Sequence, residues 1–415
     1  MKKTLTRSKT FDGDLFKVEK RLTRQSTLPS FTHAAEFDYK RDTKQLMKIL
    51  KNCVTAHMLD LDCILHFLSS YNCEQRMIII HDLDYEYHYN LIDMVLERPE
   101  SPIRSCTLAM LVEPVELCAR HFHDFLTEKL TKKDDKNISR VLLEILLGLN
   151  NDDVQKFKET YEQVFGTAAQ NDITVALGAE GILPNLLTQL LQGERYEDSA
   201  GSSTTAKYVA KGLYEATSDT PIIDDDTLIK IFTQDSFSQL ASIFDFYEDK
   251  YGQPFLEAIE RRFQNPIEIQ YFQDIIEFTH SPSGYYSHLL RQALEKTPID
   301  YVTIIRIIVG REEKDLGEIK LEYSKIYDET LDQTLKQRLD NLEIKRLLIM
   351  IVTGGVDITA NDSGPVRFDH VNNSNSTGSG SNSPTATTNG HQGARKFSHE
   401  AFDRFVNVFK QMRSH

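Results

Sequence analysis

Two acidic clusters carry the residue types that could bind a hard cation such as calcium. One cluster is Asp134 and Asp135, the other runs from Asp224 to Asp226, and an apolar run follows each. Calcium takes about six to eight oxygen ligands, so these carboxylates would need backbone carbonyls from a sharply turning loop beside them. Without such carbonyls, a carboxylate cluster is typical of a solvated helix start, where it complements the helix dipole. Both interpretations remain open from the clusters alone.

The sequence contains none of the short motifs that mark common catalytic sites. It has no GxxxxGK[ST] phosphate loop, no GxSxG and no HExxH. His121 and His123 are close together, but no further ligand set surrounds them in the sequence. A histidine that serves the fold is therefore favoured over a metal ligand. We expect a protein that is not an enzyme.

The cysteines indicate a reducing compartment. All five lie in the first third of the chain, at positions 53, 63, 73, 106 and 118. An odd count without CxxC spacing is typical of free thiols. No apolar run approaches the roughly 20 residues of a membrane span, and the N-terminus lacks the apolar stretch of a secretory signal. These features predict a cytoplasmic protein.

The charge of the chain is unevenly placed. The net charge is −14, yet residues 1–33 hold eight Lys and Arg against three acids, which leaves +5 there and −19 in the remainder. An acidic body argues against duplex nucleic acid as a partner. The basic segment is a separate feature that needs its own explanation.

The acidic clusters, the histidines and the cysteines lie within a helical pattern that recurs four times along the chain. Each copy opens a helix with a short apolar run and continues into a second helix that carries Tyr or Phe. With Leu65, Leu143, Ile229 and Ile305 taken as equivalent, the steps are 78, 86 and 76 residues. Copies of one such unit are typical of an array of small helical bundles. The predicted repeats are 37–112, 113–198, 199–283 and 284–355.

The two ends of the chain lie outside the predicted repeats. Residues 1–36 are predicted to form a basic, mostly disordered arm, and residues 356–394 a disordered linker rich in Asn, Ser and Gly. Residues 395–415 are predicted to form an amphipathic helix with Ser398 as its cap and a stripe of apolar side chains. The stripe consists of Phe402, Phe405, Val406, Phe409 and Met412.

The repeats resemble those of the annexin family over about residues 37–355. The segments that carry the resemblance are Phe37–Asp42, Tyr161–Gly166, Leu186–Gly193, Phe244–Gly252 and Leu347–Gly355. The resemblance implies an all-α fold in which each repeat is a right-handed bundle of five helices and four repeats form a curved disc. It also implies peripheral binding to anionic phospholipid through calcium on the convex face. There, a Gly-x-Gly-Thr loop supplies carbonyls and an Asp or Glu about 40 residues later completes the shell.

The four equivalent loops depart from the family pattern. They read Asn52–Thr55, Asp134–Asn137, Thr220–Asp224 and Thr297–Asp300, and none contains either loop glycine. Pro221 and Pro298 instead favour ordinary helix starts, with Thr220 or Thr297 able to act as the cap. The candidate calcium ligands that remain are Asp224, Asp300, Glu268 and Glu343. Calcium is thus implied as a cofactor by the resemblance only, and we predict that calcium dependence is weak or lost.

A family member without its calcium loops needs another way to meet a membrane. Lys and Arg near an anionic leaflet contribute around 1 kcal/mol each, and aromatic residues beside them could insert. The membrane-binding candidates are Lys2, Lys3, Arg7, Lys9, Phe11 and Phe16 in the arm, and Phe402, Phe405 and Phe409 in the terminal helix. The alternative for the arm is a plain disordered tail. The terminal helix could equally lie on a membrane, bind a protein partner or dock on the acidic body.

The arm also contains hydroxyl groups next to basic residues. The phosphorylation candidates are Ser8, Thr10, Ser26 and Thr27. A phosphate at any of them would add close to two negative charges and offset the attraction to an anionic surface. The arm therefore predicts a binding segment that phosphorylation can weaken.

Two functional hypotheses follow. The first is an annexin-like protein that binds anionic phospholipid peripherally, at the plasma membrane or at vesicles. The second is a scaffold that keeps the disc to bind proteins and no longer binds calcium or lipid. Binding to liposomes with and without calcium would separate them.

Overall fold

The computed structural model describes residues 37–54, 61–131, 136–197, 202–215 and 224–354. These residues form twenty α-helices and no strand, which confirms the predicted all-α class. No helix among them is long and apolar enough to cross a membrane. The predicted arm, linker and terminal helix lie outside the described residues.

The helices follow one another in four groups of five. The first group is α1 (Tyr39–Val54), α2 (Leu61–Leu68), α3 (Cys73–Tyr87), α4 (Leu91–Leu96) and α5 (Pro102–Met110). The second is α6 (Pro114–Thr131), α7 (Lys136–Leu147), α8 (Asn151–Phe165), α9 (Ala169–Leu177) and α10 (Ile182–Leu190). The third is α11 (Ser203–Glu215), α12 (Asp225–Gln234), α13 (Phe237–Tyr251), α14 (Phe255–Arg262) and α15 (Pro266–His280). The fourth is α16 (Pro282–Glu295), α17 (Tyr301–Arg311), α18 (Leu316–Tyr327), α19 (Leu331–Arg338) and α20 (Leu342–Val352).

The groups correspond to the predicted repeats in number and in helix count, while the residue boundaries between repeats remain predictions. The helix α16 begins at Pro282, two residues before the predicted start of the fourth repeat. We refer to the groups below as the first to the fourth repeat.

The third helix ends in the same way in all four repeats. Its C-cap residue has left-handed backbone geometry, at His88, Gly166, Gly252 and Asp328, with φ between 53° and 71°. Such a cap ends a helix because its backbone N–H can turn back to the last carbonyls. Glycine adopts this geometry without strain, and His and Asp tolerate it better than branched residues. The four-fold sequence pattern therefore reappears as a four-fold backbone feature.

In two repeats, a buried tyrosine of the third helix forms a hydrogen bond with a residue of the fourth helix. The fully buried Tyr161 donates a hydrogen bond to Asp172 on α9 at 2.8 Å, and the fully buried Tyr323 donates one to Thr334 on α19 at 3.1 Å. A buried tyrosine hydroxyl needs such a partner. Five residues before the C-cap, the second, third and fourth repeats carry a buried tyrosine, whereas the first repeat carries the buried Leu83.

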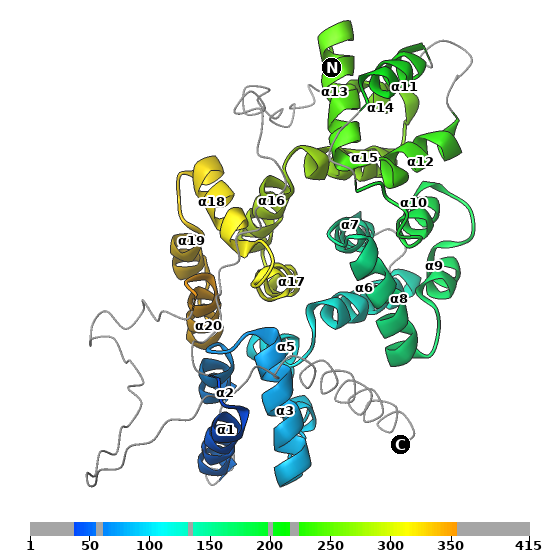
Figure 1. Ribbon diagram of the computed structural model, residues 1–415. Coiled ribbons are helices and arrows are strands. Elements are labelled where there is room, and N and C mark those ends of the chain that lie inside the picture. The colour runs from blue at the N-terminus through cyan, green and yellow to red at the C-terminus, as the bar shows by residue number, and fades with distance from the viewer. Residues whose placement is uncertain (1–36, 55–60, 132–135, 198–201, 216–223, 355–415) are drawn as a thin grey trace, which may run out of the picture.

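Figure 1 shows the four repeats arranged around a common centre as a disc. The first and fourth repeats meet where α5 packs against α17 and α20, and the second and third meet where α10 packs against α12 and α7 against α15. The two pairs join at the centre, where α6 contacts α17. The apolar core is continuous through these junctions.

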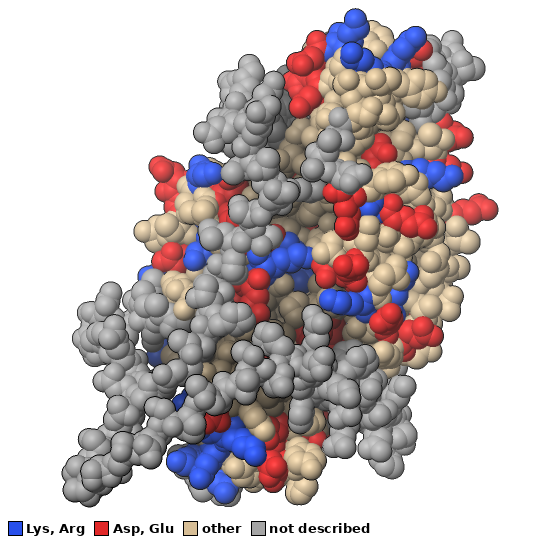
Figure 2. Space-filling view, in the orientation of Figure 1, with Lys and Arg blue, Asp and Glu red and all other residues tan. Residues whose placement is uncertain are grey.

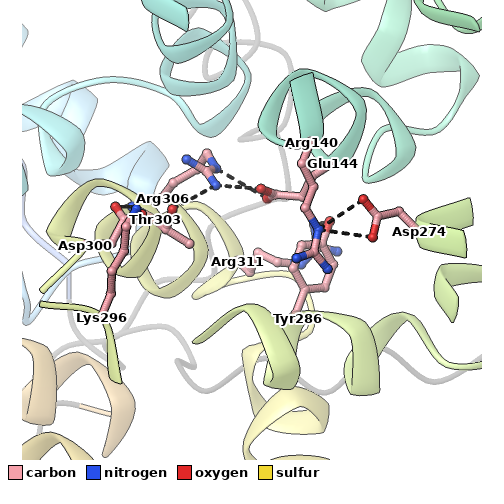
Figure 3. A network of polar contacts seen from close by, with 9 residues as sticks. All are labelled: Arg140, Glu144, Asp274, Tyr286, Lys296, Asp300, Thr303, Arg306 and Arg311. Atoms are coloured by element: carbon pink, nitrogen blue, oxygen red, sulfur yellow. Dashed lines mark hydrogen bonds and ion pairs between the residues drawn. The ribbon is translucent and has the colours of Figure 1, made fainter. Parts of the chain in front are cut away.

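Charged residues cross the junctions between repeats (Figure 3). Arg140 on α7 donates to both carboxylate oxygens of Asp274 on α15, at 3.0 Å each. Burial raises the pKa of Asp274 to about 6, although Arg140 acts in the opposite direction. Arg306 on α17 binds Glu144 on α7, which links the fourth repeat to the second. These pairs fix how the repeats are oriented, and so how their loops are presented.

Candidate functional site

The resemblance places calcium where two connections of a repeat meet: the one between the first and second helices, and the one between the fourth and fifth. Part of the first connection lies outside the described residues in three repeats, at 55–60, 132–135 and 216–223. In the fourth repeat it is described completely, from Lys296 to Asp300. The fourth repeat therefore gives the fullest view of a candidate loop.

Asp300 acts as the cap of α17 in that loop. Its Oδ1 atom accepts the backbone N–H of Thr303 at 3.1 Å, and its Oδ2 atom accepts the Lys296 ammonium at 3.1 Å. Burial alone would raise the pKa of Asp300, but the N–H of Thr303 and the Lys296 ammonium outweigh it, so the pKa lies below its usual value. Both carboxylate oxygens therefore already have protein partners (Figure 3).

The capping residues differ from those expected from the sequence. Thr297 was expected to cap α17, yet the helix begins at Tyr301, so the residue in the capping position is Asp300. Asp224 likewise caps α12, in place of Thr220. In both cases the helix starts several residues after the proline, and the acid immediately before the first helical residue supplies the capping oxygen.

In the third repeat, the acidic cluster is divided between two tasks. Asp224 accepts the backbone N–H of Thr227 at 2.7 Å, and hydrogen bonds from Thr227 lower the pKa of Asp224. Asp225 binds the Arg262 guanidinium, with Nη2 at 2.6 Å and Nε at 3.0 Å from the same Oδ1 atom. Arg262 is the last residue of α14, so this ion pair joins the two connections of the repeat.

Glu268 and Glu343, the other candidate ligands, lie in the first turns of α15 and α20. Glu343 is exposed, whereas Glu268 lines a cavity of about 240 Å³ with Lys129 and Tyr271. Within the described parts of the chain, no group of three or more His, Cys, Asp or Glu residues could hold a metal ion. The structure thus does not bring the candidate carboxylates together in such a cluster.

An arginine recurs at one position of the fourth-to-fifth connection. Arg98, Arg262 and Arg338 each lie four residues before the first residue of the fifth helix, and Gly178 takes this position in the second repeat. Arg262 follows Pro221 by 41 residues, and Arg338 follows the equivalent Pro298 by 40 residues. The resemblance implies a carboxylate at about this spacing. This spacing is the sequence signal that points to the arginines, which lie about where the family pattern has an acid.

The three arginines have different surroundings. Arg338 approaches Glu295, the last residue of α16, with Nη2 at 3.8 Å from Oε1. The Nε atom of Arg98 is buried without a hydrogen-bond partner among the described residues. In the third and fourth repeats, the arginine before the fifth helix thus lies close to an acid that borders the connection between the first and second helices.

His121, His123, Cys73 and Cys118 are held within the packing of the helices. Burial lowers the pKa of His121 to about 3, while His123 lies 3.0 Å from the Tyr161 hydroxyl and stacks on Phe165. Burial raises the pKa of Cys73 to about 12 and that of Cys118 to about 11. Thiols held in the protonated form are poor nucleophiles.

The candidates at the two ends of the chain lie outside the described residues. They are Lys2, Lys3, Arg7, Lys9, Phe11 and Phe16, the hydroxyl residues Ser8, Thr10, Ser26 and Thr27, and Phe402, Phe405 and Phe409. Their roles remain predictions.

Comparison with known proteins gives consistent results. The family model described as Annexin matches residues 208–268 and 285–351. Annexin A13 of Mus musculus is 27% identical over 321 residues, which cover 77% of this chain and 97% of that protein. Annexin B10 of Drosophila melanogaster is 26% identical over 328 residues, which cover 78% of this chain and 98% of that protein.

Solved structures show the same fold. Annexin III has a TM-score of 0.70 at 21% identity and covers 79% of this chain and 97% of its own. Calcium-bound annexin (Sm)1 has a TM-score of 0.65 at 18% identity and covers 79% of this chain and 93% of its own. The helical repeats, the family match over the third and fourth repeats and the nearly full-length relatives agree: the chain is similar to annexins in sequence and has their fold.

Proposed function

We propose that this annexin-like protein binds anionic phospholipid membranes peripherally and that its binding depends weakly or not at all on calcium. Annexins generally bind phospholipid membranes in a calcium-dependent way, and a calcium-bound annexin is among the structures that this chain resembles. The coarse activity follows from the family. The reduced role of calcium is inferred from the loops of this chain.

The observation that carries the proposal is that protein cations already occupy acids at the candidate sites. The Lys296 ammonium lies 3.1 Å from Asp300, and the Arg262 guanidinium lies 2.6 Å from Asp225. A calcium ion at either acid would have to displace that cation or remain a few ångströms from it. At such distances the repulsion amounts to several kcal/mol near a protein surface.

The loop sequences support the same proposal. A calcium site needs carbonyl oxygens turned outwards, which glycines allow at little cost. The loops of the third and fourth repeats carry Pro-Ile at positions 221–222 and 298–299 instead. Proline fixes its own φ, and β-branched isoleucine resists left-handed geometry.

Membrane attachment then has to come from other parts of the chain. The arm with its excess of +5 could bind an anionic surface by charge, and its phenylalanines could insert. The basic amphipathic segment at 395–415 could lie on the same surface or bind a protein partner. We place the protein in the cytoplasm, at the plasma membrane or at vesicles, and propose no enzymatic role.

Co-sedimentation with vesicles of phosphatidylcholine and phosphatidylserine tests the proposal. We expect similar binding in calcium and in chelator, weaker binding as salt rises, and weaker binding after deletion of residues 1–33. Tight binding in micromolar calcium that a chelator abolishes would contradict the inferred loss of calcium dependence. Binding in neither condition would favour the alternative, a scaffold for proteins built on the annexin fold.

A further inference from the structure

The first helix carries an unusual concentration of positive charge on its solvent face. The exposed cations of α1 are Lys40, Arg41, Lys44, Lys48 and Lys51. Four of them, Lys40, Lys44, Lys48 and Lys51, recur once per turn and therefore share one face of the helix, which we call the basic stripe. The opposite face buries Leu46, Met47 and Leu50, so packing fixes the direction in which the stripe points.

Acidic residues do not neutralise the basic stripe. The only acid of α1, Asp42, is 1% exposed and accepts Nε of Arg41 at 2.9 Å. Lys44, Lys48 and Lys51 form no ion pair with any residue that the structure describes. Some lysines of other helices do pair with an acid one turn away, as in Lys211–Glu215 and Lys336–Asp332.

The surface of the molecule shows the same local concentration. Figure 2 shows Lys and Arg side chains gathered at the lower end of the view, where Figure 1 places α1, while Asp and Glu are frequent over the other repeats. The whole chain has a net charge of −14, and residues 1–33, which precede α1, hold an excess of +5. The positive charge of the arm therefore continues into an ordered helix.

We propose that the basic stripe of α1 is a calcium-independent binding site for the anionic phosphate groups of a phospholipid surface. The inference rests on the proposed function and adds to it an ordered site on the first helix, separate from the loop connections. Like charges one turn apart are unfavourable for a helix on its own. Next to an anionic surface, each of these charges is attracted to the phosphates, and their contributions to binding add.

The chemistry of the stripe favours a lipid surface over a folded protein. Lysine is depleted in protein interfaces, whereas their hot spots use Trp, Tyr and Arg in closely fitted pockets. A lysine is a flexible point charge that can follow a fluid array of phosphates without shape complementarity. From Lys40 to Lys51 the stripe extends about 16 Å along the helix at the usual rise per residue. A row of this length can contact several headgroups at once. Binding of the adjacent arm to the same membrane would raise the effective concentration of headgroups near the stripe.

Binding of the full-length protein to vesicles of phosphatidylcholine and phosphatidylserine, in chelator, tests this site. The test variant is Lys44→Gln/Lys48→Gln/Lys51→Gln. Each lysine should strengthen partitioning onto the vesicles around fivefold, so we expect the variant to partition on the order of 100-fold more weakly than the wild type. The variant Lys44→Arg/Lys48→Arg/Lys51→Arg, which keeps the charge, should retain binding.

A matched control removes three charges elsewhere. Lys207→Gln/Lys230→Gln/Lys250→Gln alters exposed lysines of the third repeat and changes the net charge by the same amount. It should bind like the wild type, and thermal unfolding should show that all variants fold.

The outcomes separate this inference from the proposed function. If the wild type binds in chelator and the α1 glutamine variant binds equally well, the stripe is not the site and the proposed function stands. An equal loss in the third-repeat control would show that net charge decides, which also overturns the inference. If the wild type does not bind in chelator, the proposed function fails and the inference fails with it.

Discussion

The Arg262 guanidinium binds Asp225 across the third repeat, with Nη2 2.6 Å and Nε 3.0 Å from one carboxylate oxygen. Arg262 ends α14 and Asp225 begins α12, so a positive side chain joins the two connections between which an annexin is expected to hold calcium. The Arg262 side chain is 17% exposed and that of Asp225 54%, so solvent screens the ion pair mainly from the side of Asp225. The Arg262 side chain therefore supplies a permanent positive charge between these two connections, as part of the protein itself.

Reversing that charge should make the stability of the protein sensitive to calcium. In Arg262→Glu, the new carboxylate would repel Asp225, and loss of the ion pair should cost about 1 kcal/mol in chelator. Calcium that bridges the two carboxylates should restore about 1.4 kcal/mol at ten times its dissociation constant. Urea unfolding with and without calcium measures both effects.

Arg262→Gln is the matched control for this experiment. It removes the ion pair without adding a carboxylate, so its loss of stability should not respond to calcium. A wild type whose unfolding midpoint rises with calcium as much as that of Arg262→Glu would show that the arginine does not take the place of the metal.

Glu144 and Arg306 make a buried contact between the second and fourth repeats. The atoms Oε2 and Nη2 are 2.5 Å apart, and the side chains are 5% and 4% exposed. Glu144→Gln should destabilise the protein by about 3–5 kcal/mol because it leaves the buried guanidinium without a counter-charge. Replacing both partners in Glu144→Leu/Arg306→Met should restore most of that loss. Chemical unfolding provides the comparison, and equal losses in the two variants would contradict this account.

Glu312 should make stability depend on pH near neutrality. Burial raises the pKa of Glu312 to about 7, although the Arg76 guanidinium acts in the opposite direction. The folded state therefore binds this proton more tightly than the unfolded chain does. Its contribution to stability is complete below the usual pKa of 4.5 and is lost as the pH rises through about 7.

The variant Glu312→Gln removes that titration. Relative to Glu312→Gln, the wild type should lose on the order of 2 kcal/mol in the free energy of unfolding between about pH 5 and pH 8. Unfolding curves of both proteins across this range give the difference directly. A difference that stays constant with pH, or that changes in the opposite direction, would show that the pKa is not raised.

The helical class and the four repeats could be predicted from the sequence because apolar spacing repeats within each unit. The pair Arg262–Asp225 could not, since its members are separated by 37 residues and the fold alone brings them together. The pair Arg306–Glu144 is separated by 162 residues and joins different repeats. The chain contains 48 Lys and Arg and 62 Asp and Glu, so composition gives no basis for choosing such partners.

The exact starts of the helices that follow these loops could not be predicted from the sequence either. Pro298 indicated a helix start correctly, but α17 begins three residues later, at Tyr301. A cap is defined by the first residue with helical backbone geometry, and a shift of a few residues replaces Thr297 with Asp300. An acid that looked like a metal ligand is thus also the group that satisfies the end of a helix.

Phosphorylation of the arm should weaken membrane binding. Each phosphate adds about 1.5 to 2 negative charges, so two phosphates at Ser8 and Thr10 would offset most of the +5 excess of residues 1–33. We expect the doubly phosphorylated protein to bind anionic vesicles in chelator clearly less than the unmodified protein. The variant Ser8→Ala/Thr10→Ala should bind normally and should not respond to kinase treatment at these positions. Unchanged binding after modification would show that the arm does not contribute.

Asp300 should matter for stability more than for calcium. Asp300→Ala removes both the cap on Thr303 and the partner of Lys296, and should cost about 1 kcal/mol. Asp300→Asn keeps an oxygen that can accept the Thr303 N–H, so it should cost less than half of that amount, because Asn caps about as well as Asp. Neither variant should change the response of vesicle binding to calcium. A variant that unfolds like the wild type but loses calcium-dependent binding would instead make Asp300 a ligand, and it would show that the Lys296 ammonium gives way to the metal.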